Sequence, residues 1–244
     1  MQSALPSALS DSPLSGEKPE AGNDRLATHS ALVESGSSPA ISGSPAYEFT
    51  KRGIDLVLGT VGLAFTGLVS IIVVPLILRS SDGPAIFRQT RVGKGGKPFT
   101  CFKFRTIALD AEARKPEIAH LNEGAGPAFK IADDPRGVEK LRWLRKFSID
   151  EMPQFWNVVR GDMSLVGPRP PEPGEVADYN ARQLGRLAVK PGMTCTWQVN
   201  GRNGVGFDEW VEMDLAYIQN RNTRLDLKLI VKTIPAVLSG KGAS

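Results

Sequence analysis

The sequence predicts an α+β protein that carries one membrane-embedded helical segment, and three observations lead to this prediction. A long apolar run occupies residues 54–78. Two β-prone stretches flank a glycine-rich connection, and two amphipathic segments close the chain. A chain of 244 residues is long enough for one medium domain and a tail.

The apolar run carries no charge between Asp55 and Arg79. About 18 or more apolar residues are enough to cross a bilayer, and the backbone there must be helical because lipid offers no hydrogen-bond partners. Lys51-Arg52 precedes the run and Arg79 follows it. Two positive flanks leave the orientation ambiguous, and a hairpin that dips in and returns would place both on one side. The alternative is a buried core helix, although core helices this long usually show a polar face.

Composition and charge limit which kinds of segment and binding partner the protein can have. Residues 1–46 are rich in Ser, Pro, Ala, Gly and Glu, which predicts a disordered tail without a secretory signal. The net charge of +4 suits an anionic lipid surface or phosphate-rich substrates. Nucleic acid is disfavoured because the basic residues are spread out rather than clustered in a stripe. Cys101 and Cys195 lack the spacing of a thiolate metal site and suit a reducing compartment.

Residues 85–92 and 98–106 are predicted to form a β-hairpin. In the second strand, Lys103 and Arg105 alternate with phenylalanines. Successive strand side chains point to opposite faces, so we expect the two cations to share one face. The alternative is an ordinary solvated strand face.

Ser148 and Glu151 match the capping-box pattern S-x-x-E, so a helix is predicted to begin there and to run to about Val159. This places the adjacent carboxylates Asp150 and Glu151 at a helix N-terminus. Such a pair can divide the work of phosphoryl transfer, one carboxylate attacking phosphorus while the pair holds Mg²⁺. The alternative is helix capping with a favourable dipole interaction, of about 0.3–1 kcal/mol per charge.

Phosphoryl transfer also requires cations around the phosphate oxygens. Arg169 stands between two prolines that fix the backbone, which favours a pre-positioned guanidinium for phosphate. The candidate cations lie on loops or at element ends: Lys103, Arg105, Arg145, Arg169 and Arg202.

Three further segments show helical patterns. Residues 138–146 predict a short cationic helix with one apolar face. Residues 207–218 and 225–238 repeat apolar side chains at helical spacing, so each is expected either to lie in the membrane interface or to pack on the core.

Five separated motifs together resemble the bacterial sugar transferase family. This family comprises the monotopic polyprenyl-phosphate phosphoglycosyltransferases of the exopolysaccharide and undecaprenyl-phosphate galactose phosphotransferase type. The resemblance covers residues 48–238 in collinear order. The motifs are KRxxD at residues 51–55, GPAIFRQTRVGKGGKPFTCFKFRT, SIDEMPQFWNVVRGDMSLVGPRPP, KPGMTCTWQVNGRN and LDLKLIVKT.

The resemblance implies that a sugar 1-phosphate moves from a nucleoside diphosphate sugar, usually a UDP-sugar, to undecaprenyl phosphate. It implies that Asp150 forms a covalent phosphosugar adduct and that Glu151 assists with Mg²⁺. Arg145 matches the basic residue before this pair, and Arg169 matches a phosphate or nucleotide contact. Lys103 and Arg105 match the basic pair of the KFR motif.

The resemblance also implies a layout at the cytoplasmic face of the bacterial inner membrane. We expect a disordered tail over 1–46, a re-entrant helix–break–helix over 47–79 and a catalytic domain over 80–240, with membrane lipid as a partner. The break is expected near Thr66-Gly67, where family members commonly carry Ser-Pro. A homodimer and the identity of the sugar are left open. The competing hypotheses are a membrane-anchored scaffold with a decayed site and a hydrolase that passes an aspartyl-phosphate to water.

Overall fold

The computed structural model describes most of the chain from Gly43 to Gly240. The described residues are 43–111, 113–114, 116–123, 126–128, 131, 134–200 and 206–240. The predicted tail over residues 1–46 therefore lies almost wholly outside them.

Helices and two small sheets make up the fold, so the predicted α+β class is confirmed. The helices are α2 (Pro45–Ser80), α3 (Arg142–Lys146), α4 (Gln154–Arg160), α5 (Pro173–Ala177), α6 (Ala181–Leu184), α7 (Thr196–Asn200), α8 (Phe207–Asn220) and α9 (Thr223–Ser239). Strands β1 (Ile86–Val92) and β2 (Pro98–Phe104) form the predicted antiparallel hairpin, and β3 (Ser164–Val166) pairs in parallel with β4 (Gly192–Thr194). Short 3₁₀ turns cover Lys94–Gly96, Ala119–Leu121, Glu139–Leu141, Ile149–Glu151 and Gly185–Ala188.

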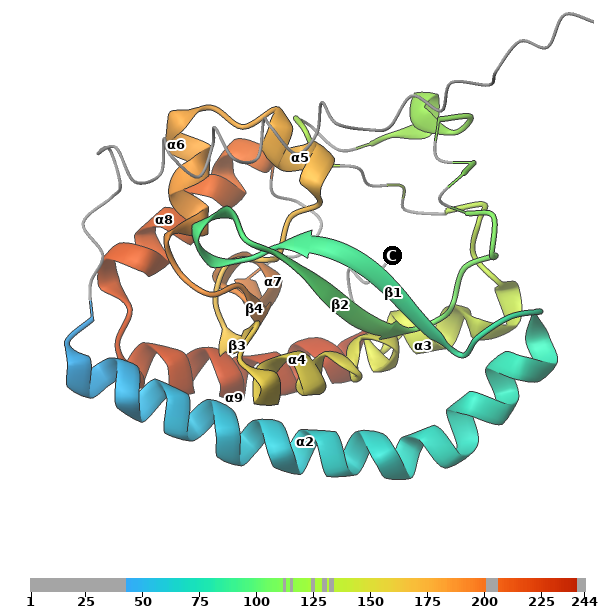
Figure 1. The fold of residues 1–244 in the computed structure, drawn as a ribbon, viewed down its shortest axis with the longest axis horizontal. Helices are drawn as coiled ribbons and strands as arrows, with labels where there is room; N and C mark the ends of the chain where they lie inside the picture. The colour runs from blue at the N-terminus through green and yellow to red at the C-terminus, as the bar shows by residue number, and fades with distance from the viewer. Residues whose placement is uncertain are drawn as a thin grey trace, which may run out of the picture.

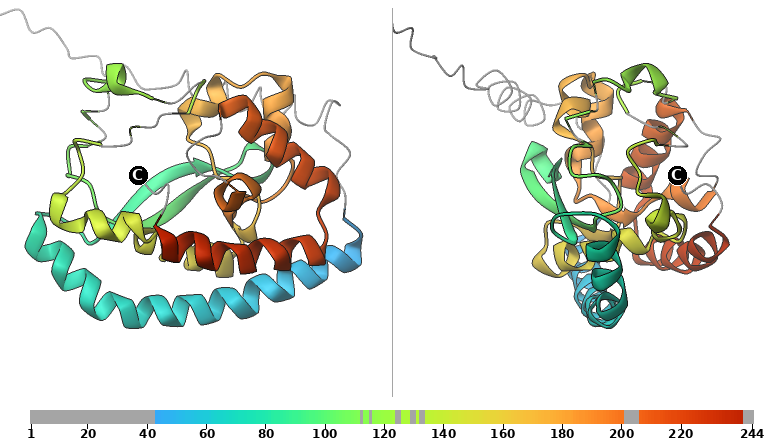
Figure 2. Two further views of the ribbon diagram at one scale, coloured as in Figure 1. Left: turned by 180° about the vertical axis from the view of Figure 1, so that it is seen from behind. Right: turned by 90° about the vertical axis from the view of Figure 1, so that its right-hand side faces the viewer.

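Helix α2 lies along one edge of the molecule, with α4 and α9 directly above it (Figure 1). Seen along the helix, α4 and α9 stand on opposite sides of α2 (Figure 2). The hairpin and α5 to α8 form the rest of the body. The main core joins β3 to α8 and its neighbours through buried side chains such as Val166, Trp197, Trp210 and Ile218.

The predicted membrane segment is one continuous helix. Ser44 caps its first turn by accepting from the Tyr47 backbone N–H at 3.2 Å. The predicted break near Thr66-Gly67 is wrong, because the helix passes through both residues. The Thr66 hydroxyl donates to the Gly62 carbonyl within the helix at 2.8 Å, and a glycine permits a kink without imposing one. Instead the helix curves, and its C-terminal end turns toward the body (Figure 1).

The Lys51 side chain, near the start of α2, forms an ion pair and hydrogen bonds with other elements of the protein. The Lys51 ammonium contacts the Asp226 carboxylate of α9 at 2.9 Å and donates to the Val166 carbonyl of β3 at 2.9 Å. The hydroxyls of Tyr47 and Tyr217 also donate to Asp226, at 2.9 and 2.7 Å. This buried network joins α2, α8, α9 and β3, and Lys51 is therefore not a free positive flank.

The other two residues of the KRxxD motif, Arg52 and Asp55, bind α4 and β3. The Arg52 guanidinium donates to the carbonyls of Val158 and Val159, each at 2.8 Å, at the C-terminal end of α4. The Asp55 carboxylate accepts from the Ser164 hydroxyl at 3.0 Å and from the Leu165 backbone N–H at 2.9 Å. Each contact satisfies a main-chain or hydroxyl group that burial would otherwise penalise.

The far end of α2 packs on the same body. Val73 and Ile77 are buried against Phe104 of β2 and against Leu141 and Leu144. The last two residues belong to the predicted 138–146 segment, which forms a 3₁₀ turn followed by α3, with the expected apolar face inward.

The two C-terminal amphipathic segments differ in their packing. In α8 the apolar residues at helical spacing are all buried in the core, so packing rather than the membrane interface accounts for them: Phe207, Trp210, Val211, Leu215 and Ile218. In α9 Leu229 is buried, whereas Leu227, Val231, Ile234 and Leu238 are exposed. Helix α9 therefore keeps an apolar face that no described residue covers.

Asn157 joins α4 to the edge of β2. Its side-chain oxygen accepts from the Phe102 backbone N–H at 3.2 Å, and its side-chain nitrogen donates to the Thr100 carbonyl at 2.7 Å. The fully buried amide thus satisfies an edge donor and an edge acceptor of the strand, as a neighbouring strand would. This contact sets the position of β2, which carries Lys103, relative to the segment that carries Glu151.

Replacing Asp226 with asparagine is expected to lower the free energy of unfolding by about 3–5 kcal/mol, because the Lys51 ammonium would stay buried without a counter-charge. The measurement is the unfolding midpoint of the purified protein in detergent, followed by circular dichroism. Glu212→Gln is the matched control, since its ion pair with Arg182 is exposed and its loss should leave the midpoint unchanged. Equal losses in both variants would contradict this account of the network.

Replacing Asn157 with leucine, which has a similar volume, is expected to destabilise the fold. The Phe102 N–H and the Thr100 carbonyl would lose their partner, at about 1–3 kcal/mol for each group. Asn220→Leu serves as the control, because the Asn220 amide is exposed and bonds only to Ala216 of its own helix. An unchanged midpoint for Asn157→Leu would rule out the proposed clamp.

Candidate active site

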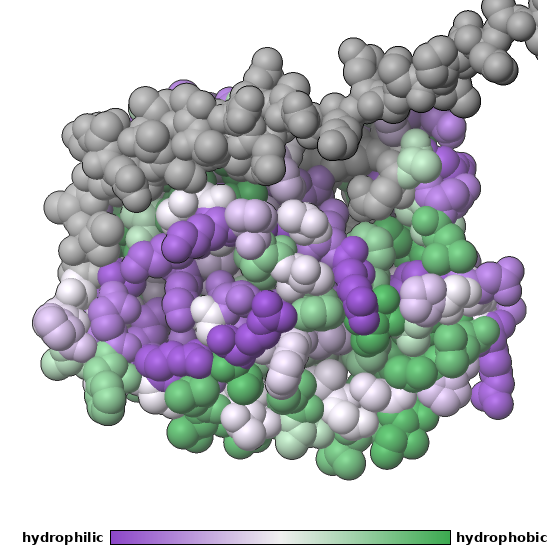
Figure 3. Space-filling model, viewed as in Figure 1, coloured by the Kyte–Doolittle hydropathy of each residue, from purple (hydrophilic) through white to green (hydrophobic). Residues whose placement is uncertain are grey.

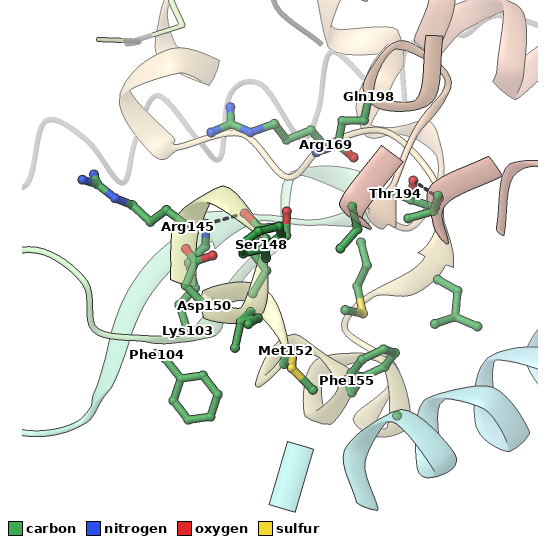
Figure 4. A pocket seen from close by; sticks show the side chains of 18 of the residues that line it. Lys103, Phe104, Arg145, Ser148, Asp150, Met152, Phe155, Arg169, Thr194 and Gln198 are labelled. Carbon is green, nitrogen blue, oxygen red and sulfur yellow. Dashed lines mark hydrogen bonds and ion pairs between the residues drawn. The ribbon is translucent and has the colours of Figure 1, made fainter. Parts of the chain in front are cut away.

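A cavity of about 1150 Å³ lies between the hairpin, the Ile149–Glu151 turn, the loop after β3, and helices α2 and α9. Its charged lining comprises Arg91, Lys103, Arg136, Arg145, Asp150, Glu151, Arg169 and Glu172. Apolar side chains line the side toward the two helices. Figure 4 shows Asp150 with Arg169 above it, while Met152 and Phe155 lie below, between Asp150 and α2.

The two carboxylates lie in a tight turn. Ser148, just before them, has a φ of 53°, which is the left-handed region and is unusual for a residue other than glycine. In this conformation its side chain caps nothing, so the predicted capping box is wrong. Residues 149–151 form a 3₁₀ turn, and α4 begins only at Gln154. The strained residue thus turns the chain so that Asp150 and Glu151 both line the cavity.

Lys103 and Glu151 form an ion pair of 2.9 Å across the cavity wall. Desolvation disfavours the charge on Glu151, but the Lys103 ammonium, together with Arg169 and Arg91, outweighs it and holds the pKa of Glu151 below its ordinary value. Desolvation and the adjacent Glu151 charge raise the pKa of Asp150 to about 7. The environment therefore separates two adjacent carboxyl groups into one that is firmly ionised and one that titrates near neutrality.

The loop that carries Arg169 is held rigidly, as its prolines predict. Its main-chain carbonyls at Pro168, Pro170 and Pro171 accept hydrogen bonds at 2.8, 3.0 and 3.0 Å. The Arg169 guanidinium makes one long ion pair with Glu175, at 3.8 Å, and lines the cavity. Arg169 is therefore placed where it can meet a second anion.

Arg145 also reaches the cavity, from the end of α3. Its Nε is buried without a hydrogen-bond partner in the described part of the chain. Its guanidinium passes so close to Gly137 that a Cβ there would lie 2.1 Å from Nη2. Glycine at 137 thus makes room for this side chain, and the guanidinium keeps donors that an anionic ligand can use.

The structure does not bring Arg105 to the site. Its side chain is buried and donates to four main-chain carbonyls, those of Ser81, Asp82, Gly83 and Pro84. The expectation that Arg105 and Lys103 form a cationic pair facing substrate is wrong, since β2 ends at Phe104 and Arg105 instead fixes the loop after α2. Arg202 lies outside the described residues.

Sequence reasoning missed the polar residues that β1 contributes. Gln89 and Arg91 line the cavity, and Arg91 donates to the Pro170 carbonyl at 3.0 Å and to Glu172 at 3.2 Å. Arg91 thereby ties the hairpin to the loop that carries Arg169. The signal was present, because Phe87, Gln89 and Arg91 alternate at the strand period and so share one face.

The donor atoms at the dyad fit a magnesium ion. Mg²⁺ in phosphate-handling sites is held by one or two carboxylates, with substrate phosphates and waters completing the shell. Asp150 and Glu151 supply two such carboxylates at the cavity wall. No cluster of three or more acidic, histidine or cysteine ligands occurs among the described residues, so the remaining ligands would come from substrate and water.

Comparison with known proteins gives a consistent result. The family model described as bacterial sugar transferase matches residues 46–240. The chain is 46% identical over 194 residues to galactosyl transferase CpsE of Streptococcus agalactiae, a match that covers 79% of this chain and 43% of that protein.

Two other relatives span different lengths. Undecaprenyl-phosphate galactose phosphotransferase of Salmonella typhimurium is 38% identical over 200 residues, covering 80% of this chain and 42% of that protein. Exopolysaccharide production protein ExoY of Rhizobium meliloti is 34% identical over 203 residues, covering 82% of this chain and 90% of ExoY. The chain thus spans less than half of the larger relatives but nearly all of ExoY. With a family match over residues 46–240 and the dyad inside it, the chain belongs to the bacterial sugar transferase family.

Proposed function

We propose that this protein transfers a sugar 1-phosphate from a nucleoside diphosphate sugar, a UDP-sugar in our proposal, to undecaprenyl phosphate. The product would initiate the assembly of an exopolysaccharide or related glycan. The observation that carries the proposal is the Asp150–Glu151 pair, in a cavity with cations on one side and the apolar face of α2 on the other. The name of the Salmonella relative supports the same lipid acceptor and the same kind of transfer, and the name of ExoY supports a part in exopolysaccharide production.

In the first step the Asp150 carboxylate attacks the phosphorus that bears the sugar. A bond forms between that phosphorus and the Asp150 oxygen, and the bond to the bridging oxygen breaks. The nucleoside monophosphate leaves with the electron pair. Lys103, Arg145 and Arg169 line the same cavity and are placed to stabilise negative charge on the phosphoryl oxygens.

In the second step a phosphate oxygen of the lipid attacks the same phosphorus. The bond to Asp150 breaks, the carboxylate is regenerated, and a lipid-linked diphosphate sugar forms. The two substrates use one nucleophile in turn, so the reaction is ping-pong. Glu151 and Asp150 would hold Mg²⁺, which when bound neutralises phosphate charge.

The two ends of α2 support a re-entrant position in the membrane. A helix of 36 residues is about 54 Å long, more than a bilayer core is thick. Yet its start is tied to α9 through Lys51, and Ile77 near its end is buried against α3. A segment whose two ends pack on one body enters and leaves on the same side.

The apolar surface of α2 agrees with this position. Apolar residues gather along the edge where α2 lies, below the hydrophilic face of the hairpin (Figure 3). The exposed apolar residues of α2 outside the cavity include Val57, Leu68, Ile71 and Ile72. We therefore propose that the middle of α2 dips into the cytoplasmic leaflet of the bacterial inner membrane, which holds the dyad at the depth of a lipid phosphate.

Asp150→Asn is expected to abolish release of UMP from a UDP-sugar in the presence of undecaprenyl phosphate and Mg²⁺, because the amide is a far weaker nucleophile. The wild-type protein, mixed with a UDP-sugar alone, should gain the mass of one sugar phosphate by intact mass spectrometry. Asp178→Asn, an exposed site outside the cavity, is the control and should behave as wild type.

Two results would overturn the proposal. Full activity of Asp150→Asn would exclude it as nucleophile. Sugar-phosphate release to water at the lipid-dependent rate would indicate a hydrolase.

Single cysteines introduced at Thr50 and at Asp82, both exposed, test the topology. Both native cysteines are buried and free, so they should react poorly. In intact cells both introduced thiols should resist a membrane-impermeant maleimide and should react after permeabilisation. Labelling of one position from outside would mean that α2 spans the membrane.

A further inference from the structure

The cavity that contains the dyad continues as an apolar cleft between α2 and α9. From α2 it is lined by Leu58, Val61 and Phe65, and from α9 by Ile230, Ile234 and Leu238. The first set recurs at i, i+3 and i+7 and the second at i, i+4 and i+8, so each set forms one helix face. Because residues of both faces line the same cavity, the two helix faces border one cleft.

These side chains are poorly covered by the protein itself. Val61 is 63% exposed, Phe65 58% and Ile234 59%. Contiguous exposed apolar surface on this scale marks an interaction with lipid, ligand or partner. Since the surface is one wall of the reaction cavity, the occupant has to be something that reaches the dyad.

Helices α2 and α4 approach closely at the cleft. Phe155 of α4 lies against Gly62 of α2, and a Cβ at Gly62 would approach the ring at 2.5 Å. Both residues line the cavity, so this contact forms part of its apolar wall. Met152, next to the dyad, continues the apolar lining toward Asp150 (Figure 4).

Two hydroxyls at the α9 side of the cleft, one from β4 and one from α9, are satisfied internally. The hydroxyls of Thr194 and Thr233 lie 2.7 Å apart, and Thr233 also donates to the Leu229 carbonyl at 2.8 Å. Neither hydroxyl needs a ligand partner, so this wall can accept a hydrocarbon without leaving them unpaired.

The two ends of the cavity differ in chemistry. One end has Lys103, Arg145 and Arg169, and suits an anionic head group. The other end suits a hydrocarbon. A nucleotide sugar has no long apolar part, whereas a lipid phosphate has both parts joined in this order.

We propose that the hydrocarbon chain of the lipid phosphate acceptor lies in the cleft between α2 and α9, with its phosphate at the dyad. This inference rests on the proposed function and adds where the acceptor chain binds. The chain would pass between the faces that carry Val61 and Ile234 and leave toward the bilayer. The donor half of the reaction, which releases the nucleotide, does not use this cleft.

The test introduces a bulky side chain into the cleft from α9 or from α2. Ile234→Trp and Val61→Trp insert bulk into the cleft. Val231→Trp on α9 and Ile71→Trp on α2 are matched controls, since both residues are exposed, neither lines the cavity, and Ile71 lies on a different side of α2 from Val61 and Phe65. Each variant is assayed in detergent or nanodiscs for kcat/KM with undecaprenyl phosphate and with farnesyl phosphate, and for nucleotide release without acceptor.

The cleft variants should lose kcat/KM for undecaprenyl phosphate by about tenfold or more, because displacing even two methylene groups from apolar burial has an effect of that size. Their loss with farnesyl phosphate should be smaller, since fewer methylene groups need the cleft. Nucleotide release without acceptor should continue in all four variants, which also shows that they fold. The controls should match wild type in every assay.

Two outcomes would overturn the inference. Unchanged use of undecaprenyl phosphate by the cleft variants would place the chain elsewhere. Equal losses in cleft and control variants would indicate a general effect of the membrane-facing surface. Failure of the wild-type protein to use undecaprenyl phosphate would refute the proposed function itself, and is a separate result.

Discussion

The structure depends on the charged groups at the start of its apolar helix. Lys51, Arg52 and Asp55 lie within two turns of α2, and each binds a different part of the body. Arg52 holds the end of α4, which follows the dyad, and Asp55 holds β3, which leads into the Arg169 loop. Lys51 and Asp55 are buried and Arg52 is partly buried, and such charged groups are costly to remove from water unless every partner is in place. The same few contacts that hold α2 therefore also align the segments that carry the dyad and Arg169.

In the function that we propose, this arrangement lets a water-soluble donor and a lipid acceptor meet. The anion-binding end of the cavity is built by the hairpin, the tight turn at Ser148 and the rigid proline loop. The apolar end is built by α2 and α9. Helix α2 is fixed to the body of the protein at both ends. In the membrane position that we propose, the distance between bilayer and dyad is therefore set by packed structure rather than by a flexible tether.

Much of the site was predictable from local pattern. The adjacent carboxylates, the proline-flanked Arg169 and the alternating hairpin are short-range signals that survive in the structure. Arg105 was not predictable in the same way, because its role depends on where the loop at Ser81 comes to lie after α2 has packed. The capping box at Ser148 failed for a related reason. Its sequence fits a helix start, but the fold needs a left-handed residue there to aim the dyad into the cavity.

By itself, the sequence determined most element types and the apolar segment, and it singled out the carboxylate pair, because these follow from hydrophobic periodicity and residue type along the chain. Only the tertiary structure decided which partners the charged side chains bind. Lys51 could be read as a membrane flank, but Asp226, distant in sequence, makes it an internal ion pair. The tertiary structure likewise set the ends of α2 on one body and the faces of α2 and α9 across one cleft. Contacts between residues far apart in the chain depend on packing, and no local pattern contains them.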